Sequence, residues 1–209
     1  RTIRYRFAVL FSNDLNEDLD MKLVYGVGVN NKQRPAKSGT REYSVWVHML
    51  KRCYNPSEVN KCYIGCEVSE SFKNYTFFYD WYTSQIGSNS GFELDKDLFL
   101  KGNREYHEDK CILLPKEING ALKNSTSARG FLPMGVDLYQ KGKSGKYIAR
   151  FNCGTTRIFL GIFPTPETAF QAYKMARENH IKVLANKYKS EIDPRAYTAL
   201  MNYQVEITD

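Results

Sequence analysis

The sequence predicts an α+β protein in which helices and short strands occupy separate segments. Three observations support this prediction. Apolar residues recur at helical spacing before residue 85, a strand–loop–strand–helix pattern runs from Glu93 to Leu122, and three strands followed by one helix fill most of the remainder. A hydrophobic content of 42% and an aromatic content of 14% are typical of a folded chain.

The bulk properties indicate a protein of the cytoplasm. No segment approaches the roughly 20 apolar residues that a membrane span needs, and the start lacks the apolar run of a signal peptide. The chain has five cysteines, and an odd number is not typical of a secreted disulfide framework. We therefore expect a soluble cytoplasmic chain with reduced thiols and no membrane partner.

The net charge of +7 is concentrated in the C-terminal part of the chain. Residues 121–209 contain 13 Lys and Arg against 7 Asp and Glu, a net charge of +6, whereas residues 1–120 are close to neutral. This asymmetry is typical of a polyanion-binding module joined to a near-neutral one, although a charge of this size can also serve solubility alone.

A first domain is expected over residues 21–123, after an N-terminal arm of residues 1–20 that carries no motif and has no assigned role. The domain begins with a predicted strand that is interrupted by Gly26 and Gly28. A loop rich in glycine, proline and lysine follows.

Two helices are predicted next. The first, Tyr43–Cys53, is amphipathic, with apolar residues on one face. The second, Ser71–Tyr82, carries an aromatic stripe that we interpret as core. The predicted core residues of the two helices are Trp46, Met49, Leu50, Cys53, Phe72, Tyr75, Tyr79 and Tyr82.

Four cysteines raise the question of a structural zinc site, namely Cys53, Cys62, Cys66 and Cys111. Structural zinc favours paired ligands two to four residues apart, and only Cys62 and Cys66 have a comparable spacing. Four thiolates from separate segments could still meet, but buried free thiols are the expected state.

The stretch from Glu93 begins as a strand. Leu94, Lys96 and Leu98 alternate with Asp95 and Asp97, which is the period of a strand with one apolar face and one acidic face. The strand is followed by a polar loop that starts at residues 101–103, Lys-Gly-Asn.

A partner strand and a helix complete the stretch. Cys111–Leu114 is an apolar run too short for a helix. Pro115 suits the first turn of a helix over Lys116–Leu122, which places Ile118 and Leu122 on one face with Asn119 beside them. The two aspartates and this asparagine would therefore converge from opposite ends of the unit.

Two carboxylates and an amide are hard oxygen donors of the kind that Mg²⁺ prefers. Phosphate oxygens of a phosphodiester could complete the coordination shell of such an ion. The simpler interpretation is that Asp95 and Asp97 form the solvated face of an edge strand and that Asn119 is a helix-surface residue.

The stretch resembles the ββα-metal core of HNH-type nucleases, and most closely the phage-type free-standing endonucleases of that family. The motifs that carry the resemblance are LDKD, then KGN, then a cysteine, then IN. The resemblance implies a metal-dependent, homing-type or nicking DNA endonuclease, which would work in the host cytoplasm if it is phage-encoded.

Site roles follow by position within those motifs. Asp95 or Asp97 together with Asn119 would hold Mg²⁺ or another divalent cation, and Asn103 would orient the loop. The chain departs from the family because no histidine follows either aspartate. Lys96, the second aspartate or His107 would then activate water, unless the metal alone does so; His107 taken by itself is typical of a solvated loop residue.

A second domain is expected over residues 129–188, after a polar linker. It contains three antiparallel strands, predicted at residues 134–140, 146–153 and 156–163, packed on one helix. Thr165 is a good N-cap for that helix and Pro166 suits its first position. Residues 189–209 are expected to form a short helix and a tail.

The strands of this domain predict one face toward the helix and one open face. In the second strand Tyr147, Ala149, Phe151 and Cys153 would face the helix, and Ile148, Arg150 and Asn152 the other side. Basic, amide and aromatic side chains on an open sheet suit a reader of DNA grooves. An ordinary solvated sheet face is the alternative.

The domain also resembles the APETALA or ethylene-response-factor type of DNA-binding domain, through GV, GKY-A-RF, R-F-LGIF and T-ETA-AY. Asp137 and Asn152 stand where plant members tend to carry arginine, so base preference does not transfer. By this match the residues that face duplex DNA would be Tyr139, Lys141, Lys143, Lys146, Arg150, Asn152, Arg157 and Phe159.

Together the two halves predict a monomer or weak dimer that cuts duplex DNA held by its C-terminal domain. The competing hypothesis is a sequence-specific DNA-binding protein with a catalytically inert nuclease core, which the missing histidine favours.

Overall fold

The computed structural model describes residues 22–36, 39–123, 131–140 and 145–209. The expected N-terminal arm, the linker at residues 124–130, and Lys141 and Lys143 lie outside the described residues. Within them, helices and strands are mixed, and a separate three-stranded antiparallel sheet packs on one helix, so the α+β prediction is confirmed. No described helix combines the length and the apolar character needed to cross a membrane.

The chain divides into two compact units. The first ends at Ser84 and also contains Gly102–Cys111, whereas the second contains Gln85–Lys101 and Ile112–Asp209. The boundary expected near residue 124 therefore falls inside the second unit. As a consequence, the predicted strand–strand–helix stretch is shared between the units, and its strands and helix belong with the C-terminal sheet.

The first unit is built on helices. It contains α2 (Arg41–Tyr54), a 3-10 helix (Glu58–Tyr63), α3 (Glu70–Lys73) and α4 (Tyr75–Ser84). Two short strands, β1 (Glu67–Val68) and β3 (Glu105–Tyr106), pair in parallel. The buried face of α2 is the predicted one, Trp46, Met49, Leu50 and Cys53.

One predicted helix is two helices. The chain breaks between α3 and α4 at Asn74, whose side-chain oxygen accepts hydrogen bonds from the backbone N–H groups of Thr76 (2.9 Å) and Phe77 (3.3 Å). An asparagine side chain that satisfies these donors acts as a cap, and so it starts a new helix. Phe78 is fully buried in α4, whereas Tyr79 from the predicted stripe is only half-buried.

The strand predicted after Met21 is wrong in its described part. Residues 24–28 form a turn closed by a single bridge between Val24 and Gly28. Gly28 lies against the core, because a Cβ built there would be 2.4 Å from Leu50 Cδ1. The glycine therefore serves close packing rather than a strand.

The second unit contains two sheets and three helices in its described part. Strands β2 (Glu93–Asp95) and β4 (Ile112–Leu114) are antiparallel, and α5 (Lys116–Leu122) follows directly. The larger sheet has the order β5 (Val136–Leu138), β6 (Tyr147–Cys153) and β7 (Thr156–Phe163), and the helices α6 (Pro166–Lys187) and α7 (Pro194–Met201) complete the unit.

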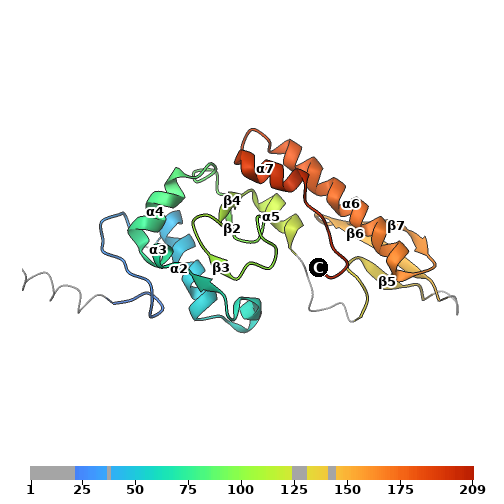
Figure 1. The fold of residues 1–209 in the computed structure, drawn as a ribbon, viewed down its shortest axis with the longest axis horizontal. Coiled ribbons are helices and arrows are strands. Elements are labelled where there is room, and N and C mark those ends of the chain that lie inside the picture. The colour runs from blue at the N-terminus through green and yellow to red at the C-terminus, as the bar shows by residue number, and fades with distance from the viewer. Residues whose placement is uncertain (1–21, 37–38, 124–130, 141–144) are drawn as a thin grey trace, which may run out of the picture. The chain divides into compact units, whose positions relative to one another are not determined.

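The helix α6 runs along one face of the larger sheet (Figure 1). Thr165 caps it, since the side chain accepts a hydrogen bond from the backbone N–H of Thr168. Tyr147, Ala149, Phe151 and Cys153 belong to the core beneath α6, as predicted. The buried residues of this core are Met134, Val136, Ala149, Phe151, Ala169, Phe170, Tyr173 and Val205.

The first predicted strand of the metal stretch is shorter than expected. It ends at Asp95 instead of continuing through Leu98, because the Asp95 Oδ1 accepts hydrogen bonds from the backbone N–H groups of Asp97 (3.0 Å) and Leu98 (2.8 Å). An aspartate that bonds its own following backbone favours a turn over a strand.

Candidate functional site

Acidic and amide side chains meet where β2 lies beside α5. Glu93 and Asp95 are two residues apart on β2 and therefore share one face of the strand. The Asn119 Nδ2 of α5 donates a hydrogen bond of 2.7 Å to the Glu93 Oε2. Sequence reasoning missed Glu93, although its spacing from Asp95 would have placed it on the acidic face.

The Asp95 carboxylate accepts two backbone hydrogen bonds and is largely buried. Burial raises the pKa of the Asp95 carboxyl, and the nearby charge of Asp97 raises it further. The two backbone N–H donors lower this pKa, but the net result is a raised pKa. The carboxylate is therefore held in one orientation in surroundings that disfavour its charge. Such an environment is typical of residues that serve a site rather than stability.

Lys96 and Asp97 form a pair at the end of the strand. Lys96 is only 7% exposed, and its Nζ lies 2.8 and 2.9 Å from the two carboxylate oxygens of Asp97. The carboxylate of Asp97 is about half exposed. The lysine thus positions an accessible carboxylate next to Asp95.

The other two predicted site residues lie in the first unit. Asn103 is buried and bonds both backbone groups of Glu105 at the start of β3: its Nδ2 donates to the carbonyl at 2.7 Å and its Oδ1 accepts from the N–H at 3.1 Å. His107 is half-buried, and its Nδ1 accepts a hydrogen bond from the Asp109 N–H at 3.1 Å. Asn103 therefore shapes the loop around it.

No group of three or more His, Cys, Asp or Glu side chains suited to a metal occurs among the described residues. Cys53, Cys66 and Cys111 are buried thiols, and Cys62 is exposed. The set at β2 and α5 is of a different kind: the Glu93 carboxylate bonds the Asn119 amide, Asp95 shares the strand face of Glu93, and oxygen donors of this kind are harder ligands than thiolates.

The open face of the larger sheet carries the predicted DNA-facing side chains. Arg150 pairs with Phe159 across the β6–β7 ladder, and Asn152 pairs with Arg157, so these four side chains share one face. Phe159 is 61% exposed. Ile148, also expected to be open, is buried, because it lies on the central strand between Asp137 and Ile162.

Asp137 organises this face, a role that sequence reasoning did not assign to it. Its Oδ2 accepts hydrogen bonds from Arg150 Nη1 at 2.8 Å and from Arg157 Nη2 at 2.9 Å. One carboxylate therefore fixes two guanidinium groups from neighbouring strands. Lys146 is exposed and immediately precedes β6. Tyr139 is half-buried, and its N–H donates a hydrogen bond to the Lys146 carbonyl.

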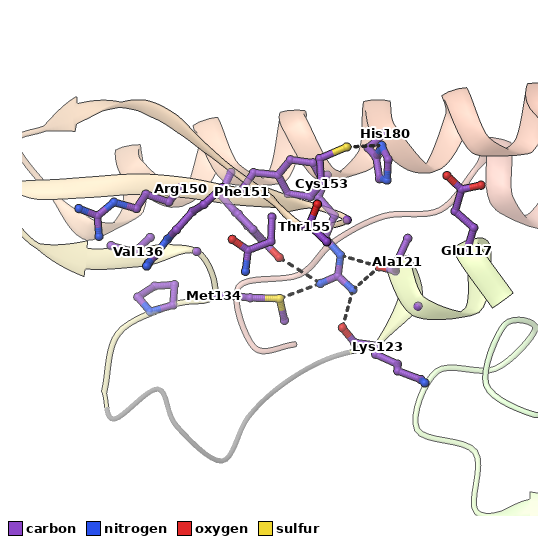
Figure 2. A pocket seen from close by; sticks show the side chains of 18 of the residues that line it. Glu117, Ala121, Lys123, Met134, Val136, Arg150, Phe151, Cys153, Thr155 and His180 are labelled. Atoms are coloured by element: carbon purple, nitrogen blue, oxygen red, sulfur yellow. Dashed lines mark hydrogen bonds between the residues drawn. The ribbon is translucent and has the colours of Figure 1, made fainter.

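A groove in the second unit is lined by α5, the sheet and α6 (Figure 2). Cys153 Sγ lies 3.6 Å from His180 Nδ1 on one side of it. The buried guanidinium group of Arg177 donates hydrogen bonds to the carbonyls of Ala121 and Lys123 at the end of α5 and contacts Met134. The groove thus borders both the helix that carries Asn119 and the sheet that carries the arginines.

Replacing Asp95 by asparagine is expected to stabilise the chain at pH 7 by about 0.5–1 kcal/mol. The amide keeps the oxygen that accepts the two N–H groups but removes the buried charge. Because the folded pKa lies above the unfolded value of about 3.9, the wild-type penalty is present at neutral pH and fades as the pH falls toward that value. Urea unfolding between pH 7 and about pH 4 measures the difference.

Asp193→Asn is the matched control, and it is expected to lower the free energy of unfolding at pH 7. The hydrogen bond from Arg195 lowers the pKa of Asp193, so its charge stabilises the fold at neutral pH and this contribution is lost as the pH falls. A loss of stability at pH 7 in Asp95→Asn as well would contradict the penalty assigned to Asp95.

Comparison of the chain with protein-family models, with curated proteins and with solved structures found no match.

Proposed function

We propose that the chain is a metal-dependent DNA endonuclease of the HNH type, homing or nicking, that hydrolyses phosphodiester bonds in duplex DNA. The observation that carries the proposal is the hydrogen bond between Asn119 on α5 and Glu93 on β2. It joins the amide and the acidic strand face in a unit of two antiparallel strands and one helix. This is the arrangement expected of a ββα-metal core.

The donor set fits Mg²⁺, since the ion prefers carboxylate and amide oxygens and leaves positions for phosphate oxygens. Asp95 and Asn119 would hold it, with Glu93 as a further carboxylate. When bound, Mg²⁺ would polarise the scissile phosphate and stabilise the charge of the leaving 3′ oxygen.

The side chains around this set have separate roles in the proposal. Asn119 is oriented by Glu93, and Asp95 is oriented by the turn that it caps. Asp97, half-exposed and held by Lys96, would accept the proton of the attacking water on a carboxylate oxygen. No histidine is needed for that step.

Duplex DNA is the proposed partner of the open sheet face. Arginine presents paired donors that suit guanine edges and phosphates, and an exposed aromatic ring can contact bases or sugars. Arg150 and Arg157 are held in place by Asp137 and flank Phe159 and Asn152. One proposed site per chain suits a nick by a monomer, and a double-strand cut would need a weak dimer or two binding events.

One observation favours a second candidate, a sequence-specific DNA-binding protein with an inert core. Both oxygens of Asp97 already lie within hydrogen-bond distance of Lys96 Nζ. A carboxylate engaged in this way could be purely structural, and the sheet would then carry the whole function.

The test is incubation of the purified chain with supercoiled plasmid, with Mg²⁺ and with EDTA. The endonuclease predicts conversion to the nicked form in Mg²⁺ alone. A set of duplexes selected by binding from a randomised pool guards against a plasmid that lacks the target. Binding without cleavage of the selected duplexes would replace the endonuclease with the second candidate.

A further inference from the structure

Arg177 is a buried cation in the middle of α6. Its side chain is 2% exposed, and its Nη2 donates hydrogen bonds to the backbone carbonyls of Ala121 (3.0 Å), Leu122 (3.1 Å) and Lys123 (3.2 Å). The same group contacts Met134 Sδ and Tyr173 Oη. Figure 2 labels Ala121 and Lys123 at the end of α5 and Met134 beside the sheet, the residues that these bonds join.

These contacts close the C-terminal end of α5. The last carbonyls of a helix have no partners within it and carry the negative end of the helix dipole. A guanidinium group supplies several donors and a positive charge at once, so it satisfies both requirements. Arg177 therefore caps α5 from a different helix.

The first turn of α5 is tied to the same helix. The Glu117 Oε2 accepts hydrogen bonds from Lys187 Nζ and from Tyr188 Oη, the latter at 2.9 Å. Arg177 and Lys187 are separated by about 15 Å along α6. Both ends of α5 are thus fixed on one continuous helix.

That helix also carries the sheet. Ala169, Phe170 and Tyr173 of α6 lie in the core with Ala149 and Phe151 of β6. A second tie comes from the chain after α7, where Lys101 Nζ donates to the Gln204 carbonyl (2.5 Å) and pairs with Asp209 (2.7 Å) while Val205 is fully buried in that core. The segment after β2 is thereby held as well.

We infer that Arg177 is a positioning residue that sets a fixed offset between the DNA sequence read by the sheet and the phosphodiester bond cut beside α5. The inference rests on the proposed endonuclease function. In the alternative mechanism, the length of the segment that joins α5 to the sheet, residues 124–130, would set the offset. The two mechanisms predict opposite responses to changes in the linker and in Arg177.

The experiment compares the full chain with two variants on a duplex that the wild type selects from a randomised pool in EDTA. One variant is Arg177→Met and the other has four Gly and Ser residues inserted after Ser127. The wild type and the insertion variant are expected to cut at one and the same position. Arg177→Met is expected to cut at several neighbouring phosphates while its protected footprint on the duplex stays unchanged.

Amide hydrogen exchange provides a readout that does not need cleavage. Exchange within residues 116–122 is expected to be about tenfold faster in Arg177→Met than in the wild type, because the cap on α5 is lost. Lys182→Met, which removes one charge from the same helix, should leave exchange and cut position unchanged. If the methionine variant loses the footprint, Arg177→Lys replaces it in both measurements.

The outcomes separate the inference from the function on which it rests. Unchanged exchange in α5 together with an unchanged cut position in Arg177→Met would overturn the positioning role, as would a cut position that moves with the linker insertion. Absence of cleavage by the wild type would refute the endonuclease, whereas faster exchange in the variant would still identify Arg177 as the cap of α5.

Discussion

Asn119→Ala is expected to lower the rate of Mg²⁺-dependent plasmid nicking by about 10³-fold. The substitution removes the proposed amide ligand and leaves the Glu93 carboxylate without its hydrogen-bond donor. DNA affinity should stay within about twofold of the wild type, because Asn119 does not belong to the sheet that is proposed to bind DNA. Single-turnover nicking and anisotropy of a labelled duplex in EDTA measure the two quantities.

Two variants control for the loss of an amide. Asn119→Asp keeps an oxygen donor at the same position and should retain more activity than the alanine variant. Asn202→Ala removes an amide that bonds the Thr198 carbonyl at the end of α7, in the same unit, and should cut normally. Unchanged nicking in Asn119→Ala would contradict the proposed site at β2 and α5, even though the chain cuts DNA.

The local elements were predictable from the sequence because local signals determine them. Thr165 and Pro166 fix the start of α6, and the two-residue period of Tyr147 to Cys153 fixes which side chains of β6 face that helix. Asp95 and Asn74 show where such reasoning fails. In both cases a polar side chain bonds the following backbone and ends an element that the hydrophobic period would have extended.

The organisation of the candidate site was less predictable, because it depends on contacts between distant segments. Nothing in the local pattern around Arg177 indicates that it caps a helix more than 50 residues earlier. In the sequence it is one of the 13 basic residues counted over residues 121–209. Likewise, Asp137 stood out in the sequence only because plant members of the similar family tend to carry arginine at that position. Its bonds to Arg150 and Arg157 depend on strands that the hairpins bring together.

Raising monovalent salt from about 50 to 200 mM is expected to weaken duplex DNA binding by about 10³-fold or more. The reason is that about six basic groups of the C-terminal part would displace counterions from phosphates. Anisotropy titrations over this range give the slope of log affinity against log salt concentration. Binding that is indifferent to salt would contradict a polyanion partner altogether.

The slope also tests how the sheet face works. Arg157→Ala should reduce it by about one if the guanidinium contacts a phosphate, whereas Arg34→Ala, which breaks a similar pair with Asp80 in the first unit, should leave it unchanged. Asp137→Asn should steepen the slope, because one negative charge leaves the face. It should also reduce the difference in binding affinity between selected and random duplexes. A carboxylate on a DNA-binding face reduces electrostatic attraction, so its benefit must lie in the orientation of Arg150 and Arg157.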